Sequence, residues 1–402
     1  MNLKHPNIRI PTKLYSAFII IKKNIPVFII AGILILVSIF AYARIQNQNQ
    51  ELANKNIELQ EKIKKIDNEL VEIKSEDQFV KNEKLQEEIE NIEKTYQEAV
   101  IKYEELINVK DKGGNTDKAD ELFAEALSLL SERNFSSASA VIKELSEELE
   151  TQDEKTSSTF SIPANVAENN TPPSSGYSRQ QVSTEIGSFL VDIVSSDLNS
   201  TRVIVDTASD SDCSNECPVL PLADYVSRSG GFAGVNGSYF CPASYPSCQG
   251  KTNTFDTLLM NKNKTYFNSD NNVYSTVPVA VFGSGWSRFI GRSLDWGRDT
   301  GVDGVIANQP LLLSGGNIAF GEDGDPKKGS RGSRSFVGVN GNTIYIGVVH
   351  NATVAEVAYA LKQLGLSEAL NLDSGGSTAL WSGGYRVGPG RNIPNAIVFV
   401  RK

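Results

Sequence analysis

The chain has 402 residues and a formal net charge of −9 at pH 7. This length allows two or three domains. The acidic balance argues against nucleic acid as the main partner, because phosphate backbones bind positively charged surfaces.

The first element is an apolar run of 19 residues, 25–43, which reads IPVFIIAGILILVSIFAYA. At a rise of about 1.5 Å per residue, a helix of this length just spans a bilayer. A cleaved signal peptide is the alternative, since Ala41-Tyr42-Ala43 fits an A-x-A cleavage site. We predict an uncleaved single-pass anchor in the cell membrane, with segment 1–24 cytoplasmic and everything after it outside. The orientation follows from basic residues that precede the run with no acidic residue among them, namely Lys4, Arg9, Lys13, Lys22 and Lys23.

Residues 44–109 are predicted to form a coiled-coil stalk. The segment is highly charged, and its apolar residues recur at heptad spacing, first every seven positions and then, after a phase slip, in 4-3 steps. We expect two copies of the chain to pair through this seam as a homodimer; a helix that docks another partner is the alternative. The seam consists of Ile45, Leu52, Leu59, Ile66, Ile73 and Val80, then Leu85, Ile89, Ile92, Tyr96, Ala99, Tyr103 and Leu106.

Residues 110–150 follow as a helical hairpin. Two amphipathic patterns, about 116–133 and 136–150, are separated by Asn134-Phe135 and resemble one tetratricopeptide unit. A single unit cannot bury its apolar face alone, so we expect it to pack on the stalk or on a second copy. Residues 151–180 are rich in Ser, Thr, Asn and Pro and are predicted to be a flexible linker.

The remaining segment, 181–402, is predicted to be an α+β domain with a strand-rich mixed sheet. Two helices are expected, about 219–227 and 354–364. The four cysteines Cys213, Cys217, Cys241 and Cys248 fit zinc-ribbon spacing poorly, so we expect disulfides in an extracytoplasmic domain, with three pairings open. Expected strands are 189–194, 202–207, 232–235, 277–282, 336–339, 343–349, 369–373 and 396–400.

A helix, a strand and a donor-rich turn follow one another near the C-terminus. Thr353 and Glu356 have the spacing of a capping box, and Gly365 fits the helix end. In the strand that follows, Asn371 and Asp373 share a face, which an ordinary buried strand disfavours. The turn after it is rich in N–H and hydroxyl donors that suit an anion, and it contains Gly375, Gly376, Ser377 and Thr378. A capped bend without function is the plainer interpretation.

The stretch NLDSGGST, residues 371–378, resembles the NLDGGGSS/T signature of the phosphodiester glycosidase domain. Two further segments are similar to that family. VNGSYF, with Asn236 and Gly237, resembles its INGGFF segment, and Arg334 with Ser335 begins a match to its R-T-x-x-G segment. His350 stands where relatives often have Asp-Gly; we consider it as an acid, a base or a residue without a role.

The resemblance implies hydrolysis of a sugar-1-phosphodiester in envelope or exopolysaccharide glycans. Arg334 and Asn236, with donors from Ser377 and Thr378, are expected to hold the phosphodiester anion. Asp373 is expected to act at the anomeric carbon as base, nucleophile or oxocarbenium stabiliser. No cofactor is predicted, and a divalent cation on Asp373 has no supporting ligand spacing. A second carboxylate does not stand out, and three remain unranked: Asp206, Asp256 and Asp303.

Two other functions compete with hydrolysis. The head domain fits a non-catalytic surface protein that binds glycan or phosphate. It also fits a structural envelope protein in which the stalk matters most. All three interpretations share the membrane anchor and differ only in what the turn around Asp373 does.

Overall fold

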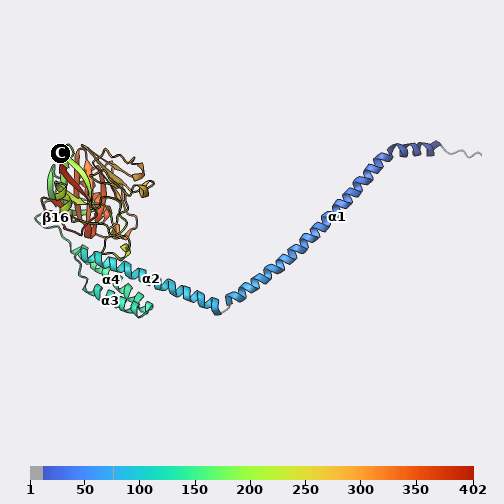
Figure 1. The fold of residues 1–402 in the computed structure, drawn as a ribbon, viewed down its shortest axis with the longest axis horizontal. Coiled ribbons are helices and arrows are strands. Elements are labelled where there is room, and N and C mark those ends of the chain that lie inside the picture. The colour runs from blue at the N-terminus through green and yellow to red at the C-terminus, as the bar shows by residue number, and fades with distance from the viewer. Residues whose placement is uncertain (1–11, 76) are drawn as a thin grey trace, which may run out of the picture. The chain divides into compact units, whose positions relative to one another are not determined.

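The computed structural model describes residues 12–75 and 77–402. The chain divides into two compact units, one up to Glu90 and the other from Asn91 to Lys402. The N-terminal unit consists of helix α1 (Thr12–Ser75) and the first part of helix α2 (Asp77–Asp111), drawn in blue in Figure 1. Lys4 and Arg9, which set the predicted orientation, lie outside the described residues.

Helix α1 contains the apolar run expected of an anchor. Among the described residues, the helix from Ile29 to Ser75 is the one long and apolar enough to cross a membrane, and its most apolar window has a mean hydropathy of 2.0. A signal sequence fits the same stretch. Further along α1, the predicted seam residues are exposed in the single chain, for example Leu52 at 59% and Ile66 at 62%. Pairing of this part with a second copy remains a prediction.

The C-terminal part of the predicted seam packs within its own chain. From residue 91 onward, α2 lies against helices α3 (Asp117–Ser131) and α4 (Phe135–Thr159). Ala99 and Leu106 are buried in this bundle, and Tyr103 stacks on Phe123 with ring centroids 5.0 Å apart. The structure thus packs the two helices of the predicted hairpin against this part of α2. In this stretch the chain's own hairpin covers the residues of the predicted seam.

The predicted linker begins later than expected, because α4 continues to Thr159. Hydroxyl groups in its last turns donate to carbonyls one turn back, Thr156 to Gln152 at 2.8 Å and Thr159 to Lys155 at 2.9 Å. Such bonds satisfy the hydroxyl groups within the helix.

The remaining residues form an α+β domain with three sheets, and the α+β class predicted from the sequence is confirmed. Each sheet is antiparallel at every named strand pair, and one isolated parallel bridge joins Glu168 to Gln181. The first sheet has the order β1 (Gly176–Thr184), β2 (Gly187–Asp197), β13 (Thr343–Ala352), β12 (Gly332–Asn340), β14 (Glu368–Ser374), β10 (Leu311–Ser314) and β11 (Asn317–Ile318).

The second and third sheets are smaller, with five strands each. The second has the order β16 (Tyr385–Val387), β15 (Leu380–Ser382), β4 (Gly231–Asn236), β17 (Asn395–Arg401) and β3 (Thr201–Thr207). The third has the order β6 (Tyr266–Phe267), β5 (Leu259–Met260), β9 (Gly304–Ala307), β7 (Val279–Gly283) and β8 (Trp286–Ile290). All eight strands expected from the sequence are present, whereas the additional strands are mostly short and carry little periodicity.

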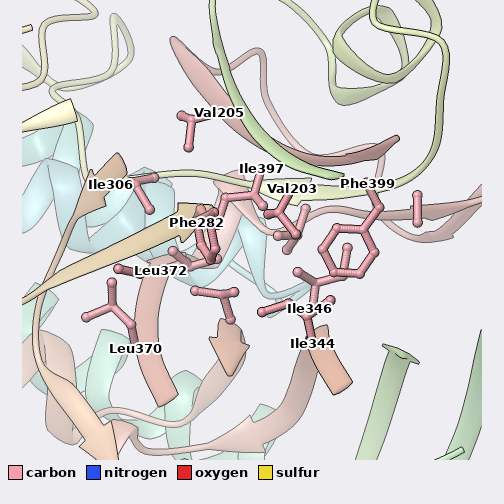
Figure 2. Packing of buried hydrophobic residues seen from close by; sticks show 14 of the residues in the cluster. Val203, Val205, Phe282, Ile306, Ile344, Ile346, Leu370, Leu372, Ile397 and Phe399 are labelled. Atoms are coloured by element: carbon pink, nitrogen blue, oxygen red, sulfur yellow. The ribbon is translucent and has the colours of Figure 1, made fainter. Parts of the chain in front are cut away.

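The main core lies where the three sheets meet. Figure 2 shows its side chains, which include Val205 of β3, Phe282 of β7, Ile346 of β13 and Ile397 of β17. Helix α7 (Val354–Gln363) covers the other face of the first sheet, and helix α5 (Leu222–Arg228) covers the other face of the second. The short elements are α6 (Pro326–Gly329) and the 3-10 turns Pro246–Cys248, Asp270–Asn272, Ser293–Asp295 and Gly375–Ser377.

The capping box of α7 is confirmed. The Thr353 side chain accepts from the Glu356 backbone N–H, and the Glu356 carboxylate accepts from the Thr353 backbone N–H. The four cysteines form two disulfides, Cys213–Cys217 and Cys241–Cys248. Each bridge closes a short loop, and the second fixes the loop that carries Tyr245.

Candidate active site

The site forms where the ends of β4 and β14 meet. The Asn236 side-chain amide donates to the Asp373 carbonyl at 2.7 Å, and the Asp373 backbone N–H donates to the Gly237 carbonyl at 2.9 Å. Gly237 lies so close to the terminal strand that a Cβ there would be 1.9 Å from Asn395 Oδ1. These contacts fix the backbone of Asp373 and leave its carboxylate to face the turn that follows.

The Asp373 carboxyl group has an unusual proton affinity. Burial raises its pKa from 3.8 to about 6, although hydrogen bonds from the Ser377 side chain and the Ser374 backbone N–H act in the opposite direction. The Ser374 contact is 2.9 Å long. A carboxylic acid with such a pKa changes its charge near neutral pH, which suits acid–base or nucleophilic work.

Arg334 reaches the same site from β12. The register of β12 shifts on both sides of this residue, and such bulges redirect a side chain. The side chain is 7% exposed and donates to the carbonyls of Ala352, Lys327 and Ser330 at 3.2, 2.9 and 2.5 Å. No described residue accepts a hydrogen bond from Nη1. Burial lowers the Arg334 pKa, but a guanidinium stays protonated in proteins.

The turn 375–378 connects the site to its surroundings. Gly375 has a φ of +64°, a conformation that favours glycine. Gly376 accepts a hydrogen bond from the Arg391 backbone N–H at 2.7 Å, and Thr378 Oγ1 donates to the Ser333 carbonyl at 3.1 Å. The Thr378 hydroxyl therefore supports the turn and does not point to a ligand.

These groups surround one cavity of about 360 Å³. Of the residues predicted for the site, Asp373, Arg334, Gly375 and Ser377 line it. The other residues that line it are Asn108, Lys112, Tyr239, Phe240, Pro242, Tyr245, Gln309, Asp325, Lys327, Lys328, Ser330, Gly332, Ser374 and Arg391. Five of the lining side chains are cationic and two are carboxylates, so the cavity suits an anion although the chain is acidic.

Several predicted site residues lie behind the cavity wall. Asn236 is fully buried, and its Oδ1 accepts from Ser335 Oγ at 2.7 Å and from the Ala379 backbone N–H at 3.1 Å. Its amide donates to the Asp373 carbonyl and its side chain does not line the cavity, so the structure places Asn236 to position Asp373. Its contact with a phosphodiester stays a prediction. Ser335 does not line the cavity either, and its hydroxyl donates to Asn236 Oδ1. Gly237, Gly376 and Thr378 likewise shape the backbone and do not line the cavity.

Asn371 and His350 are also absent from the cavity wall. Asn371 is buried and its Nδ2 donates to Tyr239 Oη at 2.6 Å and to the Gln309 and Leu372 carbonyls at 3.0 Å. His350 pairs through Nε2 with the buried Asp192 carboxylate at 2.7 Å and through Nδ1 with Ser333 Oγ at 3.2 Å. Both side chains support neighbouring groups in the structure, and direct substrate binding by them stays a prediction.

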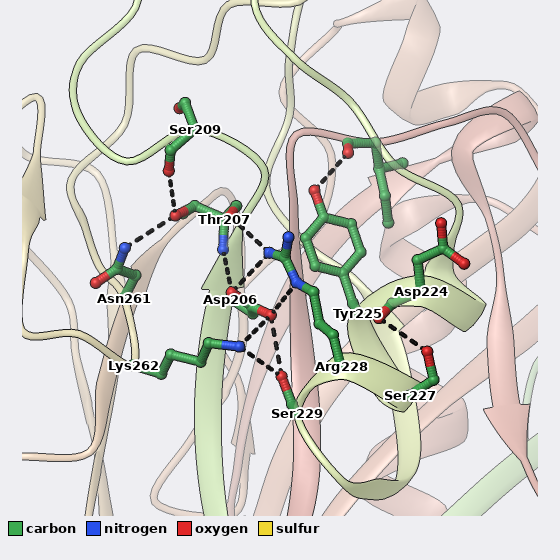
Figure 3. A network of polar contacts seen from close by, with 11 residues as sticks. Asp206, Thr207, Ser209, Asp224, Tyr225, Ser227, Arg228, Ser229, Asn261 and Lys262 are labelled. Atoms are coloured by element: carbon green, nitrogen blue, oxygen red, sulfur yellow. Dashed lines mark hydrogen bonds and ion pairs between the residues drawn. The ribbon is translucent and has the colours of Figure 1, made fainter.

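None of the three unranked carboxylates lines the cavity. Asp303 binds Arg202 at 2.7 Å, and only the main-chain carbonyl of Asp256 is used, by Asn272 at 2.7 Å. Asp206 lies in the polar network of Figure 3, where Arg228 binds both carboxylate oxygens at 2.7 and 2.8 Å and Lys262 binds one at 2.9 Å. Burial raises the Asp206 pKa, but these two cations outweigh it and lower the value below 3.8. Asp206 is therefore a fixed anion that supports β3 and α5.

The second carboxylate in the cavity is Asp325, which the sequence did not single out. One of its oxygens caps α6 by accepting from the Lys327 backbone N–H at 2.9 Å, and the other lies 3.6 Å from Lys328 Nζ. Tyr239 was missed as well. Its hydroxyl accepts from Asn371, which leaves its own proton free for the cavity, and burial followed by the Asp373 charge raises its pKa. A tyrosine directly after the Asn-Gly turn was the available signal.

Metal ligation has no visible basis in the described ranges 12–75 and 77–402, where no three His, Cys, Asp or Glu side chains gather closely enough to hold an ion.

Comparison with known families identifies this region. Residues 230–400 match the family model of phosphodiester glycosidases. This region belongs to the phosphodiester glycosidase family. The match includes β4, β12 and β14, which carry Asn236, Arg334 and Asp373. The helical bundle lies outside it. A search of curated proteins finds no match to the chain.

Solved structures that are similar to part of this chain include three from different organisms. A hypothetical protein from Synechocystis is 15% identical with a TM-score of 0.43, over 56% of this chain and 62% of its own. The zebrafish N-acetylglucosamine-1-phosphodiester alpha-N-acetylglucosaminidase catalytic domain, auto-inhibited by its pro-peptide, is 14% identical with a TM-score of 0.43, over 59% and 87%. A putative exported protein from Burkholderia pseudomallei is 11% identical with a TM-score of 0.34, over 53% and 74%. This chain thus spans less than two thirds of the Synechocystis protein.

Proposed function

We propose that the protein is a membrane-anchored phosphodiester glycosidase that hydrolyses sugar-1-phosphodiester bonds in envelope or exopolysaccharide glycans. The observation that supports it best is the presence of Asp373 and Arg334 on one cavity. A carboxyl group that ionises near pH 6 and a guanidinium with a free N–H edge suit the two ends of a sugar–phosphate bond. Membership of the phosphodiester glycosidase family supports the same reaction.

The reaction breaks the bond between the anomeric carbon and the phosphate oxygen. The bonding electron pair leaves with the phosphate, and a water molecule supplies the new hydroxyl group on the sugar. Asp373 acts at the anomeric carbon, either as a base that takes the proton of this water or as a nucleophile. Both roles need the ionised carboxylate, which the pKa of about 6 provides at neutral pH.

The leaving phosphate needs charge stabilisation more than it needs a proton, because a phosphate monoester is already a weak base. Arg334 Nη1 and Lys327 are suited to this, since both line the cavity and neither forms an ion pair with a carboxylate of the described residues. The Tyr239 hydroxyl is a further donor for the same oxygens. Asn236 takes the role of holding Asp373 in position.

The membrane location rests on α1. Its apolar side chains between residues 29 and 42 are exposed, with Phe40 at 71% and Leu36 at 67%, as expected of a surface that lipid covers. The basic residues before this run favour a cytoplasmic N-terminus and an extracytoplasmic head, and the two disulfides fit that compartment. The exposed heptad seam of α1 favours a homodimeric stalk.

The function is tested with the full chain in detergent micelles and an aryl ester of a sugar 1-phosphate as substrate. We expect release of free sugar, a loss of about 10³-fold or more in Asp373→Asn, and a loss of about 10²-fold in Arg334→Met. Asp303→Asn serves as the matched control, because Asp303 pairs with Arg202 away from the cavity. In ¹⁸O-labelled water the label is expected in the sugar, since the carbon–oxygen bond breaks.

Label found only in the phosphate would make the protein a phosphodiesterase of another kind. Tight binding of the ester without any release would instead support the non-catalytic glycan-binding protein. Retained activity in Asp373→Asn would show that the reacting group lies elsewhere.

A further inference from the structure

The end of helix α2 is part of the cavity although it precedes the family match by more than a hundred residues. Asn108 and Lys112 line the cavity. Around them, the Tyr245 hydroxyl donates to Asn108 Oδ1, and the Ser247 backbone N–H donates to Glu104 Oε1 at 3.1 Å. The Arg391 guanidinium binds the Asp111 carboxylate at 2.5 Å. The helix end therefore touches both the disulfide loop and the segment after the glycine turn.

This helix end is held rigidly. Leu106 and Val109 are buried against Ala119, Leu145 and Leu149 of the hairpin. Directly after the helix, Lys112 Nζ binds the Asp153 carboxylate of α4 at 2.6 Å, with side chains 18% and 27% exposed. Residues of the helical bundle and of the C-terminal domain therefore line the same cavity, and the ion pair with Asp153 holds Lys112 in position there.

The five cations on the cavity wall differ in whether a carboxylate pairs with them. Five cations line the cavity, and three of them are backed by Asp111, Asp153 and Asp323, none of which lines it. Arg334 and Lys327 are sufficient for the single negative charge of a phosphodiester. Lys112 and Arg391 on the helix side each bind one carboxylate outside the cavity and keep further N–H donors, which suit a second anionic group of a ligand.

The aromatic ring of Tyr245 contacts one cation of each kind, Lys327, which pairs with no carboxylate of the described residues, and the paired Arg391. Lys327 Nζ and Arg391 Cζ are both 5.5 Å from its ring centroid, a distance at which a cation is attracted to the ring. The Cys241–Cys248 bridge and the hydrogen bond to Asn108 hold the ring in place. The ring is therefore a fixed contact for both cations.

We propose that Lys112, with Arg391 and the Tyr245 ring, forms a second anion subsite, so that the preferred substrate carries another phosphate or carboxylate beside the phosphodiester that is cleaved. This inference rests on the proposed function and defines the substrate class further. It also gives the helical bundle a specificity role. A nucleoside diphosphate sugar and a glycan with phosphates on neighbouring units share the required chemistry.

Binding by the full chain in an Asp373→Asn background tests the subsite without turnover. The two probes are the methyl ester of a sugar 1-phosphate, with one negative charge, and a uridine diphosphate sugar, with two. We expect Lys112→Ala to weaken binding of the diphosphate about tenfold and binding of the methyl ester less than threefold, measured by titration calorimetry. A phosphorylated glycan fragment with two neighbouring phosphates, compared with the diphosphate, shows which source binds more tightly.

Two control variants separate charge from structure. Lys118→Ala removes a lysine of the same bundle that pairs with Glu148 at 2.8 Å and does not line the cavity, and it is expected to change neither affinity. Asp153→Asn removes the partner of Lys112 but keeps its charge, and it is expected to leave diphosphate binding at least as tight.

The outcomes are distinct. An equal loss for both probes in Lys112→Ala, or a loss in Asp153→Asn as large as in Lys112→Ala, overturns the second subsite and leaves the glycosidase proposal standing. If the parent chain binds neither probe, the proposed function itself fails and the subsite fails with it.

Discussion

The side-chain amide of Asn236 donates to the main-chain carbonyl of Asp373 at 2.7 Å, across a sequence separation of 137 residues. Together with the bond from the Asp373 backbone N–H to Gly237, it locks the end of β14 to the end of β4. Asp373 is thus positioned by a residue that does not line the cavity.

Replacing Asn236 by Ala should therefore reduce both activity and stability. The change leaves the Asp373 carbonyl, the Ser335 hydroxyl and the Ala379 N–H without partners, and we expect a loss of about 2–4 kcal/mol in the free energy of unfolding. Denaturant unfolding measures this loss, and kcat should fall while KM changes little. A variant that keeps full kcat would show that Asp373 needs no such support.

The raised pKa of Asp373 predicts an opposite effect for Asp373→Asn. Because the folded state holds this proton more tightly than the unfolded state, ionisation destabilises the fold as pH rises from 3.8 to about 6. The neutral amide avoids this cost, so the variant should be more stable than the parent above pH 6, by at most about 3 kcal/mol. The difference should disappear below pH 3.8. Unfolding measured at several pH values checks this, and a variant less stable at pH 8 contradicts it.

The same pKa predicts the pH dependence of catalysis. The ionised carboxylate is the active form, so kcat/KM should rise with pH through about 6 and then level off. The profile should be measured with the aryl ester of a sugar 1-phosphate at concentrations well below KM, where the rate reports kcat/KM of the free enzyme. A flat profile between pH 4.5 and 7.5 would assign the reacting charge to another group.

Tyr239→Phe should impair chemistry more than folding. The ring stays in place, and Asn371 Nδ2 retains its bonds to the Gln309 and Leu372 carbonyls. Loss of the free hydroxyl proton should lower kcat about 10- to 100-fold, because a donor to the leaving phosphate disappears. The matched comparison is Tyr266→Phe in strand β6 of the third sheet. The Tyr266 hydroxyl accepts from Trp296 Nε1 and donates to the Asp299 carbonyl, away from the cavity, so its removal should not affect kcat.

Asp206→Ala should act only on stability. Arg228 and Lys262 would lose their common partner while remaining partly buried, and we expect the free energy of unfolding to fall by about 3 kcal/mol. Activity per folded molecule should be unchanged. A reduced kcat in the folded fraction would return Asp206 to the list of reacting carboxylates.

Gly376→Ala tests the contact between the glycine turn and helix α2. A Cβ there would lie 2.1 Å from Asp111 Oδ2 and 2.2 Å from Arg391 Nη2, so the ion pair must open, although both are ends of flexible side chains. We expect faster amide exchange at residues 104–112 with little change in the remaining domain. Gly375→Ala is the control, since its Cβ meets nothing within 4 Å and only the positive φ of +64° costs about 1 kcal/mol. Equal exchange in both variants would mean that the contact does not hold the helix end.

Several features of this protein follow from local sequence alone. The capping box at Thr353, the alternation in β14 and the hairpin of α3 and α4 depend on neighbours within a few residues, and periodicity reveals them. Asp373 and Arg334 were identified from short motifs for the same reason, because a strand end with a glycine turn is a local feature.

Only the tertiary structure decided which groups share a cavity. Asn236 was expected to hold substrate, but its Nδ2 donates to the Asp373 carbonyl of β14 and its Oδ1 accepts from Ser335 of β12 and the Ala379 N–H. His350 was expected near the ligand, but it pairs with the buried Asp192. Asp325, Tyr239 and Lys112 reached the cavity from segments far apart in the chain. A hydrogen bond between distant segments leaves no periodic trace in a sequence, since folding pairs whichever buried polar groups meet. Short motifs therefore pointed to Asp373 and Arg334, whereas the packing of distant segments decided which other residues line the cavity.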